Sequence, residues 1–127
     1  MKNGHAIKPT RVEMELLEAL WKLGSASIRE IQESLPDSRC LEYTTVQTVV
    51  YRLEQKGAVK RVKKIGNAHI FEPLVNRKSV AATLIDDFLG AFGGAPEPFV
   101  AHLVASGAIS LKELKELEKI ARERGLR

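Results

Sequence analysis

The hydrophobic residues of the chain recur at spacings of three and four, which predicts a series of amphipathic helices. Three helices are expected in the first part of the chain, at about 10–23, 28–35 and 43–57. Their inward faces would carry Val12, Leu16, Leu17, Leu20 and Trp21, then Ile28, Ile31 and Leu35, then Val46, Val49, Val50 and Leu53. Three further helices are expected, from Asn76 to Gly93-Gly94, from about Pro96 to Gly107, and at about 111–124.

The starts of several helices are marked by capping boxes. In this pattern a Ser or Thr and a Glu or Gln three residues later satisfy each other's free backbone donors. The pattern occurs at Thr10 with Glu13, Ser27 with Glu30, Thr44 with Gln47, and Ser110 with Glu113. We therefore expect helices to begin at these four places.

The spacing changes between the third and fourth helices. Apolar Val59, Val62 and Ile65 precede the pair Gly66-Asn67, and Ile70 and Phe71 follow it. Gly-Asn favours a tight turn, so this segment predicts two short strands in a hairpin. The expected fold class is therefore mainly α with a small β-hairpin. The order of elements indicates one domain at 1–75 and a second, helical domain at 76–127.

The outward face of the segment 43–57 has an unusual composition. Exposed helix faces are commonly rich in Glu and Lys, which favour both the helix and solubility. This face carries mostly uncharged hydrogen-bonding groups: Thr44, Thr45, Gln47, Thr48, Tyr51, Arg52 and Gln55. Because threonines weaken a helix and burial does not require them here, the composition indicates a binding face.

Positive charge gathers next to this face. The chain has a formal net charge of +4, and residues 52–64 alone contain six basic side chains and one acidic one. Thr and Gln can contact base edges in the major groove of DNA, while Lys and Arg contact phosphates. We therefore predict a winged helix-turn-helix domain that binds double-stranded DNA. The expected contacts are Thr44, Thr45, Gln47, Thr48 and Arg52 from the helix, and Lys60, Arg61, Lys63 and Lys64 from the hairpin.

Catalysis and metal binding find little support in the sequence. The three histidines lie in a tail, a strand and a helix, and none has a second ligand type three or four positions away. The adjacent Asp86 and Asp87 would point about 100° apart on a helix, so they do not form a converging pair. We expect no enzyme activity, no catalytic residue, no cofactor and no metal, with Cys40 and His69 in structural roles.

The sequence also indicates the cellular compartment in which the protein works. The single cysteine allows no disulfide within the chain, and the apolar runs are far shorter than the ~20 residues of a membrane span. The first ten residues lack the apolar core of a signal peptide. We therefore expect a soluble cytoplasmic protein without membrane insertion.

The second domain carries an apolar stripe that indicates self-association. Three short helices make a poor core alone, whereas two copies packed together can bury such a stripe. Leu84, Phe88 and Phe92 lie four residues apart along one line of a helix. The expected dimer contacts are Leu84, Phe88, Phe92, Leu103, Leu114 and Leu117.

The chain resembles the bacterial penicillinase and methicillin-resistance repressors in MELLEALW with Trp21, YTTVQTVVYRLEQKGAVKR, FEPLV and FLGAFGG…PFVAHLVASGAISLKELKELEKI. This resemblance covers nearly the whole chain. It implies a homodimeric repressor with a winged-helix head on a palindromic operator and a three-helix C-terminal dimerisation domain. It also implies control of antibiotic-resistance or stress genes, and recognition by the same five residues of the helix at 43–57.

The resemblance further implies a mode of induction. In that family a regulatory protease, signalled from a membrane receptor, cleaves an Asn-Phe bond in the C-terminal domain, and the dimer leaves the DNA. The corresponding bond here is His102-Leu103, which is a candidate cleavage site that departs from the family's residues. Copper-responsive relatives carry a C-terminal cysteine motif, and no cysteine follows Cys40, so a copper response of that type is not expected.

A second hypothesis about function stays open. The same winged fold would serve as a protein-interaction module if its basic hairpin bound an acidic protein partner. Binding to DNA in the presence of competitor DNA would distinguish the two hypotheses.

Overall fold

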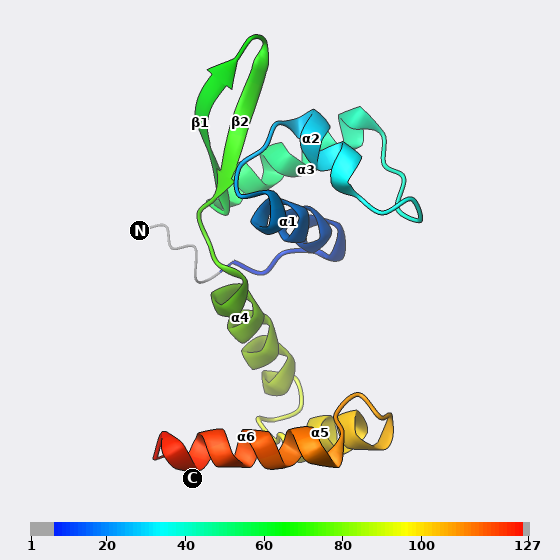
Figure 1. Ribbon diagram of the computed structural model, residues 1–127, viewed down its shortest axis with the longest axis vertical. Coiled ribbons are helices and arrows are strands. Elements are labelled where there is room, and N and C mark those ends of the chain that lie inside the picture. Colours follow the sequence, from blue (N-terminus) through cyan, green and yellow to red (C-terminus); the bar gives the residue numbers. More distant parts are fainter. Residues whose placement is uncertain (1–6, 126–127) are drawn as a thin grey trace. The chain divides into compact units, whose positions relative to one another are not determined.

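The computed structural model describes residues 7–125, and these contain the predicted order of three helices, a hairpin and three helices (Figure 1). The elements are α1 (Arg11–Leu23), α2 (Ile28–Ser34), α3 (Tyr43–Lys56), β1 (Val59–Ile65), β2 (Ala68–Pro73), α4 (Arg77–Gly90), α5 (Glu97–Ala105) and α6 (Leu111–Glu123). The predicted fold class, mainly α with a small hairpin, is confirmed. Within the described residues, every helix is too short or too polar to cross a membrane.

The chain divides into two compact units, and the division falls within α4, after Ile85. We call residues 7–85 the head and residues 86–125 the C-terminal unit. The sequence places the boundary earlier, between residues 75 and 76. The first turns of α4 belong to the head because Val80 is buried in its core and Leu84 packs against that core. Leu84 therefore has packing contacts in its own chain, and its expected dimer contact stays a prediction.

The core of the head lies between α1, α2, α3 and the base of the hairpin. Most residues predicted to point inward are buried, namely Leu16, Leu17, Leu20, Ile28, Ile31, Val46, Val49, Val50 and Leu53. Val12, Trp21 and Leu35 are only partly buried and pack against this core. The indole Nε1 of Trp21 donates a hydrogen bond to the carbonyl of Val75 at 2.8 Å, which ties α1 to the segment that follows β2.

Three of the four predicted capping boxes are present. They are Thr10 with Glu13, Ser27 with Glu30, and Ser110 with Glu113. The fourth prediction is wrong because α3 begins at Tyr43, so its cap position is two residues before Thr44. Glu42 occupies the cap in an extended conformation, and its side chain makes no capping hydrogen bond. Thr44 thus lies inside the first turn, where its hydroxyl is exposed instead of capping the helix.

The hairpin is antiparallel, with its turn at Gly66, where φ is +61°. The register of the two strands shifts between Arg61 and Lys63, which is the mark of a β-bulge. β2 also pairs with the segment that precedes α2. The backbones of Phe71 and Ala26 exchange hydrogen bonds of 3.0 and 2.8 Å. The side chain of Phe71 is fully buried, so the base of the hairpin is part of the core.

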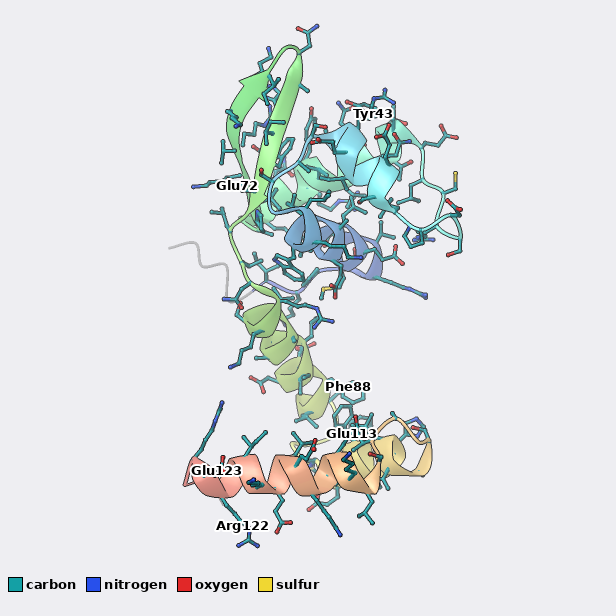
Figure 2. All side chains as sticks on the ribbon, in the orientation of Figure 1. Tyr43, Glu72, Phe88, Glu113, Arg122 and Glu123 are labelled. Carbon is teal, nitrogen blue, oxygen red and sulfur yellow. The ribbon has the colours of Figure 1, made fainter. Side chains whose placement is uncertain are left out.

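The C-terminal unit has no buried side chain in α5 or α6. Phe88, near the end of α4 (Figure 2), packs its ring edgewise against Phe92 and Phe99, with centroid distances of 4.9 and 5.4 Å. Large apolar side chains nevertheless stay exposed, including those of Phe88, Phe92, Val100, Val104, Leu111, Leu117 and Ile120. This unit therefore has large apolar side chains that its own fold does not bury.

Candidate nucleic-acid interface

The buried residues of α3 fix which of its faces meets solvent. Val46, Val49, Val50 and Leu53 pack into the core, so the opposite side of the helix points outward. The structure brings all five predicted base-contacting residues to that outward side. Thr44, Thr45, Thr48 and Arg52 are exposed, and Gln47 is partly buried.

A groove runs along the edge of α3 that is nearer to α1. Its volume is about 410 Å³, and it is lined by Thr10, Val12, Thr44, Thr45, Thr48, Val49 and Arg52. Four threonine side chains and one guanidinium thus meet in a single concave surface. Such a surface offers hydroxyl donors and acceptors, methyl groups and one positive charge, which are the groups that contact base edges in DNA.

A second groove lies between α2, α3 and the hairpin. Its volume is about 390 Å³, and it is lined by Ser27, Ile28, Arg29, Tyr43, Gln47, Tyr51, Asn67, Ala68 and His69. The amide Nε2 of Gln47 donates to the hydroxyl of Tyr51 at 3.2 Å. The guanidinium of Arg29 lies 5.2 Å from the ring centroid of Tyr43. Sequence reasoning did not name Arg29, and it gave His69 a structural role and no part in the binding face.

Arg61 is exposed but has partners within the head. Its Nε and Nη2 donate to the two carboxylate oxygens of Glu54 at 2.9 and 3.2 Å. Its guanidinium carbon lies 5.0 Å from the ring centroid of Tyr51 and 5.5 Å from that of Phe71. The hydrogen bonds to Glu54 raise the pKa of Arg61 above its ordinary value. Sequence reasoning expected a phosphate contact here, whereas the structure gives Arg61 internal partners that join β1 to α3.

The three lysines of the hairpin differ from Arg61 in their surroundings. Lys60, Lys63 and Lys64 are all exposed on β1. The bulge between Arg61 and Lys63 changes the alternation of side chains along this strand. These lysines form a positively charged hairpin beside the outward face of α3.

A buried acidic residue, Glu13, lies behind the α3 face. Its side chain is fully buried on α1, and its Oε1 accepts hydrogen bonds from the backbone of Thr10 at 2.9 Å and from Nζ of Lys56 at 2.6 Å. Its Oε2 lies 3.8 Å from Nη1 of Arg52. Burial raises the pKa of Glu13, but the hydrogen bonds from Lys56 and Thr10 and the nearby positive charges outweigh this, so the pKa is lowered. The carboxylate is therefore ionised at neutral pH.

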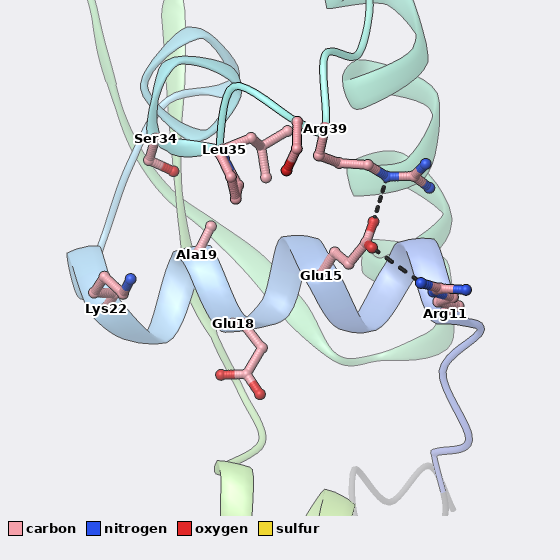
Figure 3. A pocket seen from close by; sticks show the side chains of 10 residues that line it. Arg11, Glu15, Glu18, Ala19, Lys22, Ser34, Leu35 and Arg39 are labelled. Carbon is pink, nitrogen blue, oxygen red and sulfur yellow. Dashed lines mark hydrogen bonds and ion pairs between the residues drawn. The ribbon is translucent and has the colours of Figure 1, made fainter.

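A further groove lies between α1 and the segment after α2, and has a volume of about 480 Å³ (Figure 3). Glu15 is central to it, with its carboxylate 2.7 Å from Nε of Arg39 and 3.9 Å from Nε of Arg11. Because these charges pair with one another, the groove favours neither an anion nor a cation.

No group of three His, Cys, Asp or Glu side chains is placed to hold a metal ion within residues 7–125. Cys40 is exposed on the connection between α2 and α3, while His69 lies on β2. His5 lies outside the described residues.

The candidate cleavage site lies in a helix. His102 and Leu103 are in α5, where His102 is exposed and Leu103 is partly buried. Two further residues expected at a dimer contact, Leu114 and Leu117, lie on α6, where Leu114 is partly buried and Leu117 is exposed.

Comparison with known proteins gives a consistent result. The model of the penicillinase repressor family matches residues 9–123. The penicillinase repressor of Bacillus licheniformis is 26% identical over 112 residues, which cover 87% of each chain. The transcriptional regulator BlaI of Mycobacterium tuberculosis is 32% identical over 115 residues, which cover 84% of this chain and 83% of the relative.

Two solved structures resemble the model. The solution structure of the DNA-binding domain of the repressor BlaI matches with a TM-score of 0.51 and 26% identity, over 62% of this chain and 93% of that domain. The structure of hsRosR-SG in a complex matches with a TM-score of 0.55 over 95% of this chain and 96% of the other. At 14% identity the second match concerns the fold alone.

Proposed function

Because the chain belongs to the penicillinase repressor family, we propose that it represses transcription by binding a palindromic DNA operator as a homodimer. The family is one of transcriptional repressors and not of enzymes. The observation that carries the proposal is the outward face of α3, where Thr44, Thr45, Thr48 and Arg52 line one groove together with Thr10. The lysine-rich strand β1 adds positive charge to the same unit.

The proposed contacts follow from the chemistry of each group. Thr44, Thr45, Gln47, Thr48 and Arg52 contact base edges in the major groove, where hydroxyl, amide and guanidinium groups find donors and acceptors. Lys60, Lys63 and Lys64 contact phosphates on the DNA backbone. Arg61 supports the base of the hairpin through Glu54 and has a smaller part in binding.

The proposed dimer rests on the apolar surface of the C-terminal unit. Exposed phenylalanine, valine and leucine side chains in a unit without a buried side chain in α5 or α6 favour burial against a second copy. Two-fold symmetry would present two α3 helices to two half-sites, which explains why the operator should be a palindrome.

The proposed repressor acts in the cytoplasm on antibiotic-resistance or stress genes, and a regulatory protease ends repression by cleaving the C-terminal unit. The resemblance in sequence supports this part of the proposal. Since His102-Leu103 lies in α5, cleavage there requires local unwinding of the helix.

Selection from a random duplex library tests the proposed function. The full chain is incubated with the library and non-specific competitor DNA, and the bound duplexes are amplified and sequenced. We expect a two-fold symmetric sequence to be enriched. If the chain enriches no sequence, the proposal is wrong, and an acidic protein partner for the hairpin becomes the favoured hypothesis.

Substitution of Thr48 or Arg52 by Ala should weaken binding to the selected duplex by about 1–3 kcal/mol for each base contact that is lost. Both side chains are exposed, so the head should stay folded. Discrimination should be lost at one base pair per half-site, as measured with duplexes changed at single positions. Arg77→Ala is the control for Arg52→Ala, because it removes an equal charge from α4 instead of α3. Unchanged affinity in both α3 variants would exclude α3 as the base-contacting helix.

Replacing Lys63 and Lys64 together by Ala should weaken binding to selected and unrelated DNA about equally, because phosphate contacts carry no base information. The slope of log affinity against log salt concentration should fall by roughly two units at most, near one for each lost contact. The double replacement of Lys22 and Lys78 by Ala removes the same charge elsewhere in the head and should leave the slope close to that of the wild type. An unchanged slope in the hairpin variant would show that these lysines do not contact DNA.

A further inference from the structure

The buried carboxylate of Glu13 connects the start of α1 to the outward face of α3. Full burial of a charged group is costly unless hydrogen bonds or opposite charges compensate for it. Oε1 is well satisfied, since it accepts from the backbone of Thr10 and from Nζ of Lys56. These two contacts account for the capping of α1 and for an anchor at the last turn of α3.

The second carboxylate oxygen of Glu13 is different. Oε2 is buried and accepts no hydrogen bond from the part of the chain that the structure describes. The cationic group beside it is Nη1 of Arg52, at 3.8 Å. The Arg52 side chain is half exposed, so its guanidinium faces the buried oxygen on one side and the groove of threonines on the other.

We infer that Glu13 is a positioning residue of the DNA interface, whose Oε2 holds the guanidinium of Arg52 in the orientation that contacts a base. This inference rests on the proposed DNA-binding function. A guanidinium has five donors, so one ion pair leaves others available to DNA. A free arginine loses rotamer freedom when it binds, and an ion pair formed beforehand removes part of that loss.

The inference predicts a change in DNA affinity opposite to the change that the charge of Glu13 alone would cause. Removal of a negative charge near DNA should leave non-specific affinity unchanged or raise it, because DNA is a polyanion. If Glu13 positions Arg52, the same change should lower affinity for the selected duplex. The ratio of specific to non-specific affinity should therefore fall.

Glu13→Gln is the variant that tests this. Gln also fits a capping box, so α1 keeps its start while the charge that faces Arg52 is lost. We expect affinity for the duplex selected by the wild type to fall by about tenfold, as for a partial loss of one base contact. Discrimination should be lost at the same base pair as in Arg52→Ala. Glu18→Gln is the matched control, since it removes an equal charge from α1 at a residue that pairs with Arg77 of α4; its affinity should stay at the wild-type level.

A double variant shows whether Glu13 acts through Arg52. Once Arg52 is Ala, the further change Glu13→Gln should cost no specific affinity, because the group that Glu13 positions is absent. A full tenfold loss in the double variant beyond Arg52→Ala would overturn the inference. Equal affinities of Glu13→Gln, Glu18→Gln and the wild type would overturn it as well.

A measurement without DNA separates this inference from the proposed function. Nuclear spin relaxation of the Arg52 Nε group in the free full-length chain should show a restricted side chain, and Glu13→Gln should make it mobile. A mobile Arg52 in the free wild type would overturn the inference, even if Glu13→Gln failed to fold. Failure of the wild type to select any DNA sequence would instead contradict the proposed function.

Discussion

Replacing Phe88 with Ala is expected to convert the proposed dimer to a monomer at micromolar concentration. Truncation of a packed Phe typically costs about 3–5 kcal/mol, and a symmetric dimer loses it twice. Since about 1.4 kcal/mol corresponds to a factor of ten, the monomer–dimer equilibrium should shift by several powers of ten. The head has its own core and should stay folded. Sedimentation measures the change, and thermal unfolding checks the head.

Leu23→Ala is the matched control for Phe88→Ala. Leu23 is 43% exposed at the end of α1 in the head, and Phe88 is 44% exposed. A general loss of apolar surface would affect both variants alike, whereas a dimer contact at Phe88 would affect only one. The Phe88 variant should bind single half-sites weakly and the full palindrome poorly. An intact dimer with normal operator affinity would mean that the Phe88 ring serves the fold of one chain.

Replacing Phe71 with Ala is expected to lower the free energy of unfolding of the head by about 3–5 kcal/mol. Phe71 is fully buried, its backbone pairs with Ala26, and its ring lies below the guanidinium of Arg61. The cavity would therefore open where the hairpin joins the helices. Urea unfolding, followed by the fluorescence of Trp21, measures the loss.

Ile65→Ala is the control for Phe71→Ala on the same hairpin. Ile65 is 60% exposed next to the turn, so its truncation should change the free energy of unfolding by no more than about 0.5 kcal/mol. Equal destabilisation by the two changes would show that the base of the hairpin is not part of the core.

Periodicity is a sufficient guide to the order of the helices, and in the head also to their buried faces. The residues of α3 that point inward follow from the spacing of four apolar side chains, and the outward face follows from them by geometry. The hairpin could be located because the turn-forming pair Gly66-Asn67 lies between two short segments with apolar residues. These features are local in sequence, so a single chain is enough to find them.

The residue that caps α3 could not be predicted as well. A Thr followed three residues later by a Gln satisfies the capping pattern, yet Glu42 takes the cap position and Thr44 lies in the first turn. The pattern states which side chains are able to cap, whereas the path of the chain entering the helix decides which one does so. Burial of the apolar face of α3 sets that path.

The ion pairs of the head were missed for a related reason. The contact of Glu13 with Lys56, and the position of Arg61 over the rings of Tyr51 and Phe71, bring together residues from different elements. From the sequence alone, the basic residues near the end of α3 were all expected to be available for DNA binding. The structure separates exposed lysines from charges that are already paired within the head, and only three-dimensional packing makes that distinction.

The hairpin has one more consequence, which concerns contacts between copies of the protein. It is a two-stranded sheet, so β1 presents an outer edge with backbone groups able to pair with a strand from another molecule. Lysines and a bulge along an edge strand hinder such pairing. Lys60, Lys63 and Lys64, with the bulge after Arg61, therefore protect the protein from edge-to-edge aggregation.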